Sequence, residues 1–342
     1  MIRNGFRPWG GLHSILKDFP NRPWSFVGCI SMEDRCLAAR ETLLNTNAIS
    51  QSLLFRIKDG HSRYTQEVES KTDINEAKFI ATGVQVAEIK KLLLLGRHGD
   101  IQDEIQNFLL NATSKNLIID ISSLPKKFFF LLIRKALETN SQVFENILIT
   151  YTEPESYSSK PLAENPEVWK PLPGFNGPRV EPPSMTLIIG LGYEPLGLPD
   201  LYSSGLFNNG KIRLLFPFPT SHSSVARNWE FARLLEPAPG NASTEIERID
   251  SLNVPDVFDK ISSLTLQGSE YSILAPFGPK PVSLAMCLFA SSLSKSPIAP
   301  SVFYTQPTVY NPAYSSGVKS IDGNKVINAY CIRLHGDNLY SV

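Results

Sequence analysis

Two turns in the chain have the residue types that bind anions. Each follows a short apolar run and leads into a helical pattern through a Pro-Lys pair, at residues 122–127 and at 277–280. Proline is preorganised for the first helical turn, where unpaired amides and the positive end of the helix dipole attract anions, and a lysine strengthens that attraction. We therefore expect phosphate contacts here, the alternative being ordinary helix starts with solvated lysines. The candidates are Ser122, Ser123, Lys126, Gly278 and Lys280.

A second pattern places aromatic and hydroxyl groups just past a strand. Tyr151-Thr-x-Pro154 in the first half matches Tyr304-Thr305-x-Pro307 in the second, and another tyrosine follows each run. A nucleotide base can stack on such a ring, which contributes about 1 to 3 kcal/mol per base. The alternative is that these tyrosines only cover the edge of a sheet. We take Tyr151, Tyr304 and Thr305 as ligand-binding candidates.

The loop after the first strand of each half is a third candidate. Ser31 and Glu33 in the first half correspond to Gly190, Gly192 and Glu194 in the second. The Gly-x-Gly pair is only half of a dinucleotide fingerprint, because no third glycine follows in register. We therefore assign no cofactor and keep all five residues as ligand-binding candidates.

Acid–base chemistry has three candidates, Glu33, His61 and His222. The two histidines follow the second strand of their halves at equivalent positions. Histidine titrates near neutral pH and can act as a general acid or base, although histidines in polar loops are commonly only solvated. The five histidines of the chain are dispersed and no closely spaced cysteine pair accompanies them, so we predict no metal site.

These motifs belong to two similar units. The Pro-Lys pairs lie 154 positions apart (279 minus 125), and the Tyr-Thr-x-Pro runs lie 153 apart (304 minus 151). In both halves, short apolar runs typical of buried parallel strands alternate with helical patterns, which indicates a sheet covered on both faces. We predict an α/β fold with two tandem Rossmann-like domains, mostly parallel sheets and an origin by internal duplication. Ligands of such sheets bind beyond the carboxyl ends of the strands.

The expected organisation has four segments. They are an N-terminal arm over 1–21, a first Rossmann-like domain over 22–160, a proline-rich linker over 161–183 and a second Rossmann-like domain over 184–342. In the first domain we expect strands at 24–30, 52–57, 91–95, 117–121 and 146–151, with no clear pattern between 64 and 90. The apolar segment 325–334 is expected to add an antiparallel edge strand to the second domain.

Composition limits the partners of the chain. With 33 basic and 33 acidic residues the formal net charge is zero, so no global field favours nucleic acid or an anionic membrane. We see no signal-peptide pattern and no apolar run long enough to cross a bilayer. The four cysteines are scattered and without CxxC spacing, as in reduced proteins. We expect a cytoplasmic protein without membrane attachment.

A Rossmann-like unit with a polar loop after its first strand and a lysine-bearing turn before a later helix resembles the sensor domains called CARF, the CRISPR-associated Rossmann folds. Two such units in one chain resemble the SAVED arrangement of bacterial antiviral systems, here over residues 22–160 and 184–334. The resemblance implies phosphate contacts from the loop that holds Ser122, Ser123, Lys126, Gly278 and Lys280. Ser31 and Glu33 would lie in the first-strand loop. No nuclease, protease or TIR domain is recognisable in the sequence, so the resemblance implies a separate effector protein.

We accordingly expect a nucleotide-sensing or assembly subunit of a bacterial anti-phage defence system. It would bind a nucleotide or cyclic oligonucleotide between its two like domains and signal to that separate effector. Lys126 and Lys280 would hold phosphates, while Tyr151 and Tyr304 would position bases. Two alternatives stay open: a nucleotide-processing enzyme, such as a phosphodiesterase or glycosidase, and an interaction scaffold without a ligand.

Overall fold

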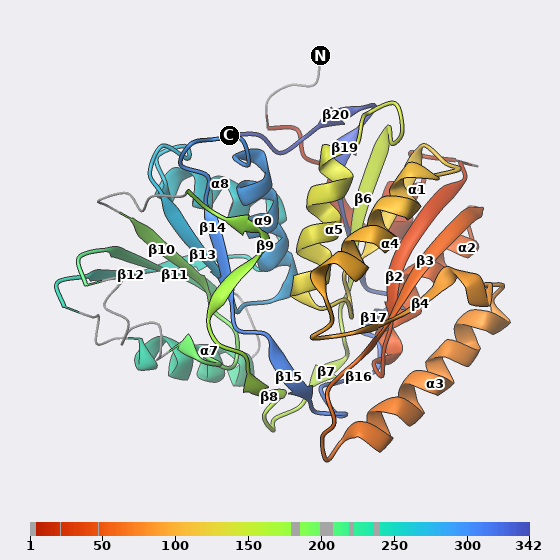
Figure 1. Ribbon diagram of the computed structural model, residues 1–342, viewed down its shortest axis with the longest axis horizontal. Helices are drawn as coiled ribbons and strands as arrows, with labels where there is room; N and C mark the ends of the chain where they lie inside the picture. Colours follow the sequence, from red (N-terminus) through yellow and green to blue (C-terminus); the bar gives the residue numbers. More distant parts are fainter. Residues whose placement is uncertain are drawn as a thin grey trace. The chain divides into compact units, whose positions relative to one another are not determined.

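The chain forms two compact units, each built on one sheet (Figure 1). The computed structural model describes residues 5–20, 22–46, 48–178, 185–198, 208–218, 222–235 and 240–342. Unit 1 comprises Met1–Asn165 and Thr308–Leu339, and unit 2 comprises Pro166–Pro307 and Tyr340–Val342.

The sheet of unit 1 has a parallel centre and an antiparallel side. Its strands are, in spatial order, β4 (Ile89–Leu93), β3 (Ile49–Lys58), β2 (Trp24–Ile30), β5 (Asn116–Asp120), β6 (Asn146–Thr152), β19 (Ile327–Leu334) and β1 (Trp9–Gly11), with β20 (Asp337–Asn338) paired to β19. The five strands β4, β3, β2, β5 and β6 run parallel to one another. Strand β19 is antiparallel to β6, and β1 is antiparallel to β19. All residues of β2, β5 and β6 are buried, as continuous apolar strands covered on both faces should be.

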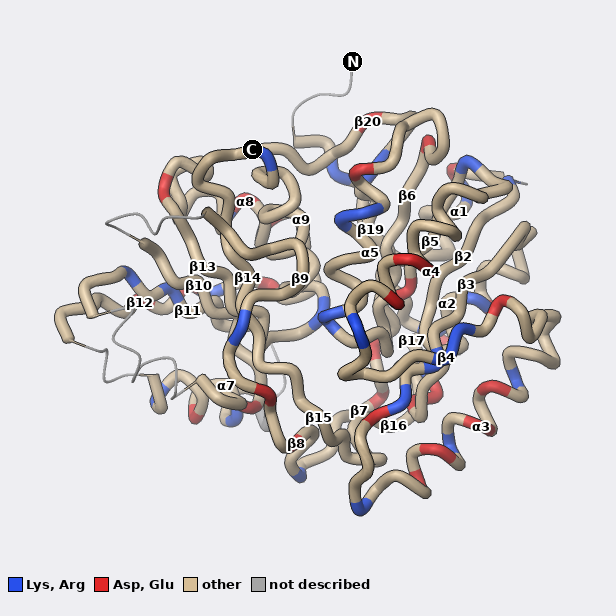
Figure 2. The backbone as a smooth tube through the Cα atoms, viewed as in Figure 1, with Lys and Arg blue, Asp and Glu red and all other residues tan. Residues whose placement is uncertain are grey.

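Helices cover both faces of this sheet. They are α1 (Leu12–Leu16), η1 (Asp34–Cys36), α2 (Ala38–Leu44), α3 (Thr65–Ala81), η2 (Val86–Glu88), α4 (His98–Leu110) and α5 (Lys126–Glu138). Helix α5 begins directly after Pro125 and buries Phe128, Phe129 and Phe130 completely. Helix α3 fills the stretch for which the sequence showed no clear pattern. It buries only Thr72, Asn75 and Phe79, and both acidic and basic residues lie along it (Figure 2), so no apolar periodicity marked it.

The sheet of unit 2 repeats this arrangement. Its strands are, in spatial order, β12 (Ser243–Ile249), β11 (Lys211–Pro217), β10 (Thr186–Gly190), β13 (Ser272–Pro276), β14 (Ser301–Tyr304) and β9 (Lys170–Asn176). The first five are parallel and β9 is antiparallel to β14. The described helices of this unit are α7 (His222–Leu234), α8 (Val254–Leu264) and α9 (Lys280–Ser292). Helices α8 and α9 pack together through the rings of Phe258 and Phe289, 5.9 Å apart.

Both sheets therefore have the doubly wound order of a Rossmann-like fold. In chain order the parallel strands of each unit are arranged 3-2-1-4-5, and an antiparallel strand follows the fifth. The predicted fold class, two Rossmann-like units with mostly parallel sheets, is confirmed. The shared strand order also supports the predicted duplication.

The antiparallel strand of each unit comes from the other half of the sequence. Strand β9 follows β6 along the chain but completes the sheet of unit 2, and β19 follows β14 but completes the sheet of unit 1. The two units have thus exchanged equivalent strands. The exchange makes each sheet depend on a segment from the far part of the chain.

The proline-rich segment expected as a linker contains strand β9, because the prolines of β9 lie in an edge strand, which tolerates them. The structure differs from the expected organisation at the segment 325–334. The segment 325–334 is not an edge strand of unit 2, because β19 lies between β6 and β1 of unit 1 with seven of its eight residues buried. The short strands of this region are β7 (Ser156–Tyr157), β8 (Ala163–Pro166), β15 (Pro307–Tyr310), β16 (Ser315–Ser316), β17 (Ser320–Ile321) and β18 (Asn324–Lys325).

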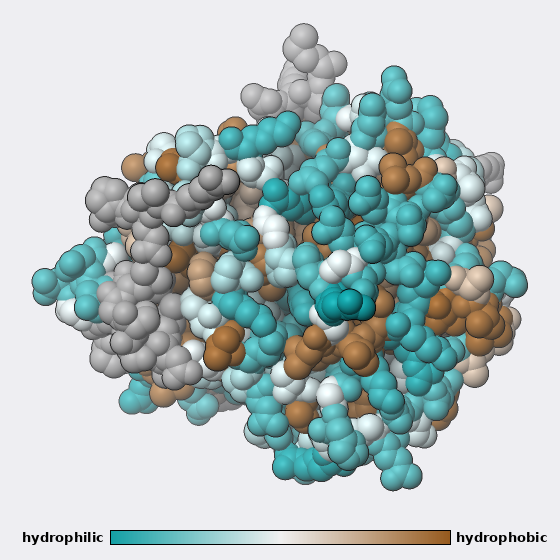
Figure 3. Space-filling view, viewed as in Figure 1, coloured by the Kyte–Doolittle hydropathy of each residue, from teal (hydrophilic) through white to brown (hydrophobic). Residues whose placement is uncertain are grey.

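The surface and the cysteines show ordinary features. On the face seen in Figure 3, apolar side chains form small separate groups among hydrophilic ones. Cys29, Cys36, Cys287 and Cys331 are all described, buried and free of disulfides. Among the helices that the structure describes, none has both the length and the apolar content needed to span a bilayer.

Candidate ligand-binding site

Most candidates of the first half gather at the carboxyl ends of β2, β5 and β6. The strand order of unit 1 reverses between β2 and β5, and ligands of doubly wound sheets bind beyond the strand ends at such a point. Ser31 and Glu33 follow β2, Ser122 follows β5, and Tyr151 lies in β6. The fold therefore brings these residues, which lie far apart in the sequence, to one end of the sheet.

A buried ion pair occupies this place. Arg35 is 2% exposed, and its Nε and Nη2 atoms lie 2.9 and 2.8 Å from Oε2 of Glu33. Its Nη1 donates to the carbonyl of Thr152 at 3.2 Å, and the hydroxyl of Ser315 donates to Glu33. Burial acts to lower the pKa of Arg35, but the attraction of Glu33 and the nearby tyrosines raises it well above its usual value. Glu33 is thus committed to an internal contact and is a poor candidate for a catalytic base.

Tyr151 belongs to the same cluster. The Arg35 guanidinium carbon lies 5.6 Å from the centroid of the Tyr151 ring and 6.0 Å from that of Tyr157. The two tyrosine hydroxyls are 2.8 Å apart, and burial raises the pKa of both phenols. Since Tyr151 is only 4% exposed, the structure gives it a packing role in place of the expected stacking on a base.

The turn after β5 uses most of its polar groups internally. Oδ1 of Asp120 accepts hydrogen bonds from the Ser122 amide at 3.2 Å, from the Ser122 hydroxyl at 2.5 Å and from Thr150 at 3.0 Å. The Ser122 hydroxyl in turn accepts the amide of Thr152 at 2.8 Å. Ser122 is completely buried, so it supports the loop. The half-buried Ser123 and Lys126 are the candidates of this turn that retain contact with solvent.

In unit 2 the candidate glycines allow two loops to pack backbone against backbone. A Cβ atom on Gly192 would lie 2.2 Å from the carbonyl oxygen of Phe277, and one on Gly278 would lie 2.9 Å from that of Leu191. A Cβ on Gly190 would meet Val282 at 3.1 Å. These contacts explain the glycines by loop packing, without the approach of a phosphate. Lys280 begins α9 and is half-buried.

The other candidates of unit 2 also have internal partners. Glu194 pairs with Arg227 at 3.2 Å. Tyr304 is 9% exposed and lies with its ring 5.8 Å from that of Phe277, and burial raises the pKa of its phenol. Thr305 donates to the carbonyl of Leu196. Tyr304 is therefore a core residue and not an open stacking platform.

The two histidines lie after the second parallel strand of each unit, as expected. His61 is exposed in the loop between β3 and α3, and His222 is the first residue of α7. The side chain of His222 lies outside the described residues. No described contact assigns either histidine a chemical role.

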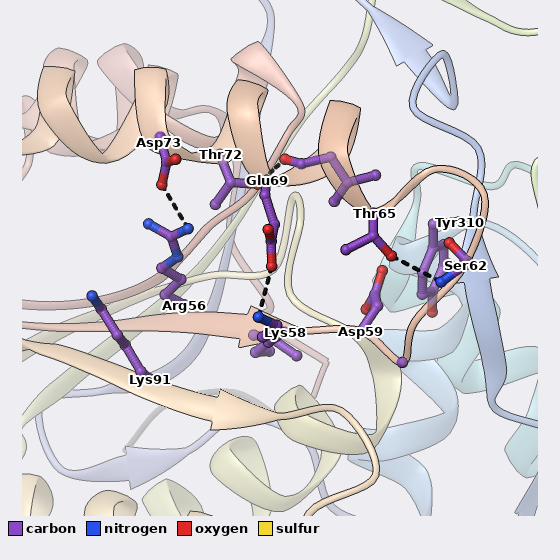
Figure 4. A pocket seen from close by; sticks show the side chains of 13 residues that line it. Arg56, Lys58, Asp59, Ser62, Thr65, Glu69, Thr72, Asp73, Lys91 and Tyr310 are labelled. Carbon is purple, nitrogen blue, oxygen red and sulfur yellow. Dashed lines mark hydrogen bonds and ion pairs between the residues drawn. The ribbon is translucent and has the colours of Figure 1, made fainter.

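A pocket of about 310 Å³ opens at the carboxyl end of β3, next to that loop. Strand β3, the following loop, the first half of α3, strand β4 and strand β15 all contribute to its wall (Figure 4). The lining residues include Arg56, Lys58, Asp59, Ser62, Thr65, Glu69, Thr72, Asp73, Lys91 and Tyr310. In Figure 4, Tyr310 and Ser62 lie at one end, Asp59 and Lys58 come next, and Arg56 and Lys91 lie at the other end.

The cations of this pocket differ in how firmly they are held. Arg56 binds Asp73 at 2.7 Å and also contacts Glu76, and Lys58 binds Glu69 at 2.7 Å. Lys91 is 4.0 Å from Glu76, and its side chain is 70% exposed. Because Arg56 already neutralises Glu76, Lys91 is the cation that a ligand anion can recruit most easily.

Asp59 is the unusual group of the pocket. Its side chain is half-buried, and burial raises the pKa of its carboxyl from 3.8 to about 6. Within the described part of the chain, no hydrogen bond or ion pair to this carboxylate is found. A perturbed titratable group in a concave site is a common mark of function. Of this loop only His61 was predicted from the sequence; an acidic residue directly after a strand was the signal available for Asp59.

Comparisons with known proteins do not identify the chain. The sequence matches no family model, and no curated protein gives a significant match. One solved structure that the fold resembles weakly is a ketoreductase domain from the bacillaene assembly line, with 10% identity and a TM-score of 0.22, over 81% of this chain and 66% of that chain. A likeness this low carries no argument about function. Among the described residues no cluster of His, Cys, Asp and Glu is arranged to hold a metal.

Proposed function

We propose that this protein is a nucleotide sensor, and that it binds a phosphate-bearing nucleotide in the pocket at the carboxyl end of β3. The carrying observation is the order of groups along that pocket: an aromatic ring, then acceptors and hydroxyls, then cations. A nucleotide presents its base, its sugar and its phosphate in the same order. The pocket also lies beyond a strand end of a doubly wound sheet, where such ligands bind.

Each end of the pocket suits one end of a nucleotide. Tyr310 is half-buried, and its ring lies 6.2 Å from that of Tyr314, so it has a restrained position on which a base can stack. Beyond Asp59, Lys58 and Lys91 supply ammonium groups for a phosphate. Lys58 pairs with Glu69, whose side chain is 42% exposed, and the largely exposed Lys91 lies 4.0 Å from Glu76, so both pairs are weak and a phosphate can replace them at little cost.

Signalling to a separate effector in bacterial antiviral defence is the second element of the proposal, and its support is the resemblance to CARF and SAVED proteins. The ligand would be bound by unit 1, and the effector would read the occupied state. Co-purification of the tagged chain with products of neighbouring genes, with and without nucleotide, tests this element. Association that does not change with nucleotide would favour a scaffold.

A nucleotide-processing enzyme is the second candidate, because Asp59 has the pKa of a general acid or base near pH 6. Incubating the purified chain with each nucleotide and analysing the mixture by chromatography separates the two. An unchanged nucleotide supports the sensor, whereas a product lost in Asp59→Asn supports the enzyme.

Isothermal titration with ribonucleoside mono- and triphosphates and cyclic dinucleotides tests the site. We expect Lys91→Ala and Tyr310→Leu each to weaken binding about 10-fold, since each removes one phosphate or stacking contact. Lys90→Ala is the matched control, because Lys90 is adjacent on β4 and, by strand alternation, points to the other face, where it pairs with Glu104. Loss of binding in Lys126→Ala with no change in Lys91→Ala would instead place the phosphate at the start of α5.

A further inference from the structure

The middle of the pocket holds an acceptor without a donor. Asp59 comes directly after β3, between the ring of Tyr310 and the ammonium group of Lys58 (Figure 4). The nearby hydroxyls of Thr65 and Ser62 act as acceptors within the turn, from the Ser62 amide at 2.8 Å and from the Tyr64 amide at 3.2 Å, and neither donates to Asp59. In the described residues nothing donates to the Asp59 carboxylate. A half-buried acceptor of this kind gains most from a ligand that brings donors.

We infer that the pocket selects ribonucleotides, because the Asp59 carboxylate accepts hydrogen bonds from the two hydroxyls of a ribose. This inference rests on the proposed nucleotide site and names the sugar that it takes. An ionised carboxylate is an acceptor only, with two oxygens, and the neighbouring 2′ and 3′ hydroxyls of a ribose offer two O–H donors. Such charge-assisted O–H···O⁻ bonds are among the strong hydrogen bonds of proteins.

The other parts of a nucleotide fit this position less well. A phosphate beside Asp59 would be repelled by the carboxylate, so the phosphate belongs at the opposite end near Lys91, where the carboxylate of Asp73 is already paired with Arg56. A base belongs on Tyr310, because the ring offers a face for stacking. Dinucleotide-binding units of the doubly wound type use an acidic side chain beyond the first βα turn for a ribose hydroxyl, so the chemistry has a general precedent.

Discrimination against a deoxyribose follows from the same geometry. A 2′-deoxynucleotide buries the carboxylate with one of its hydrogen bonds missing, and a site built to bind a hydroxyl rejects the analogue that lacks it. We expect ribonucleotides to bind at least about 10-fold more tightly than their 2′-deoxy counterparts.

The preference depends on pH, because only the ionised carboxylate accepts both hydroxyls. The charged and titratable groups around Asp59 are Lys58 and Arg56 on β3, Glu69 and Asp73 on α3, Lys91 on β4 and Tyr310 on β15. With a pKa of about 6 for Asp59 in the free protein, the carboxylate is ionised at pH 7.5 and protonated at pH 5. The ribose preference is therefore expected at pH 7.5 and should largely disappear at pH 5.

Titration of the full chain with AMP, GMP, CMP and UMP and with their 2′-deoxy counterparts tests the inference. The supporting result is a ribose preference of at least about 10-fold at pH 7.5, lost both in Asp59→Asn and in the wild type at pH 5. Circular dichroism verifies that Asp59→Asn is folded. If this variant does not fold, the comparison of wild-type binding at pH 7.5 and pH 5 decides the question.

The outcomes separate this inference from the proposed function. Equal binding of ribo and deoxy forms would overturn the ribose assignment and leave the nucleotide site in place. A preference that persists in Asp59→Asn would put the sugar contact elsewhere and would equally overturn it. If none of the four ribonucleotides and none of their 2′-deoxy counterparts binds, and the triphosphates and cyclic dinucleotides do not bind either, both proposals are overturned.

Discussion

Arg35 and Glu33 form a buried pair in which two guanidinium nitrogens approach one carboxylate oxygen, at 2.9 and 2.8 Å. The pair lies where the strand order of unit 1 reverses, the place at which doubly wound sheets usually bind ligands. A buried charged cluster therefore lies at this position, and a pocket among the described residues of unit 1 is found one strand further along, at β3.

Removing the charge of Glu33 should destabilise unit 1 strongly. In Glu33→Gln the guanidinium of Arg35 stays buried without its counter-ion, which costs about 3 to 5 kcal/mol in comparable pairs. Glu41→Gln is the control, because Glu41 pairs with Lys325 at the surface, where about 0 to 1 kcal/mol is expected. Urea unfolding measures both. Similar losses in the two variants would show that the buried pair has no special role.

A methyl group at Gly192 should loosen the loops of unit 2. The new Cβ would lie 2.2 Å from the Phe277 carbonyl oxygen, so the loops after β10 and β13 must separate. We expect Gly192→Ala to lower the free energy of unfolding by about 1 to 3 kcal/mol. Gly99→Ala, in helix α4 with no atom within 4 Å of the new Cβ, should be neutral or slightly stabilising. Differential scanning calorimetry compares them; a neutral Gly192→Ala would mean that the loops adapt freely.

Asp59 should make the free protein less stable at neutral pH than at acid pH. Its folded-state pKa of about 6 is above the value of 3.8 for an unfolded chain, so its contribution to stability is present below pH 4 and is lost as pH rises through 6. Asp59→Asn removes this penalty. Without ligand the variant should be more stable than wild type at pH 7.5, by about 1 to 3 kcal/mol, and equally stable at pH 3.5. A constant difference across that range would contradict the raised pKa.

Each exchanged strand should stabilise the sheet that it completes, β19 in unit 1 and β9 in unit 2. Ile332 in β19 is completely buried and Phe175 in β9 is 2% exposed. Large-to-small changes at such positions cost about 2 to 5 kcal/mol. Hydrogen exchange should therefore show faster exchange of β6 amides in Ile332→Ala and of β14 amides in Phe175→Ala. Each variant is the control for the other. Faster exchange of β14 amides in Ile332→Ala and of β6 amides in Phe175→Ala would contradict the exchange of strands.

Much of the architecture was predictable from local sequence. Strands such as Trp24–Ile30 and Asn146–Thr152 are continuous apolar runs, because helices cover both faces of the sheet. The repeated Pro-Lys pairs mark real helix starts, at α5 and α9. Helix α3 was missed because its exposed, charge-rich sequence has almost no apolar periodicity. Its ion pairs with Arg56 and Lys58 of β3 are contacts between elements, which a single strand or helix pattern does not contain.

In the candidate site, too, some features were predictable from local sequence and others depend on contacts between elements. The sequence by itself determined which polar residues lie beyond the strand ends, since strand boundaries and chain order depend on local patterns. Only the tertiary structure decided which of them remain open. Glu33 forms an ion pair with the buried Arg35, and the ring of Tyr151 packs against the same guanidinium. Among the described residues, in contrast, the carboxylate of Asp59 has no hydrogen-bond or ion-pair partner. The exchange of β9 and β19 was likewise beyond local patterns, because the choice of partner strand depends on contacts between residues more than a hundred positions apart.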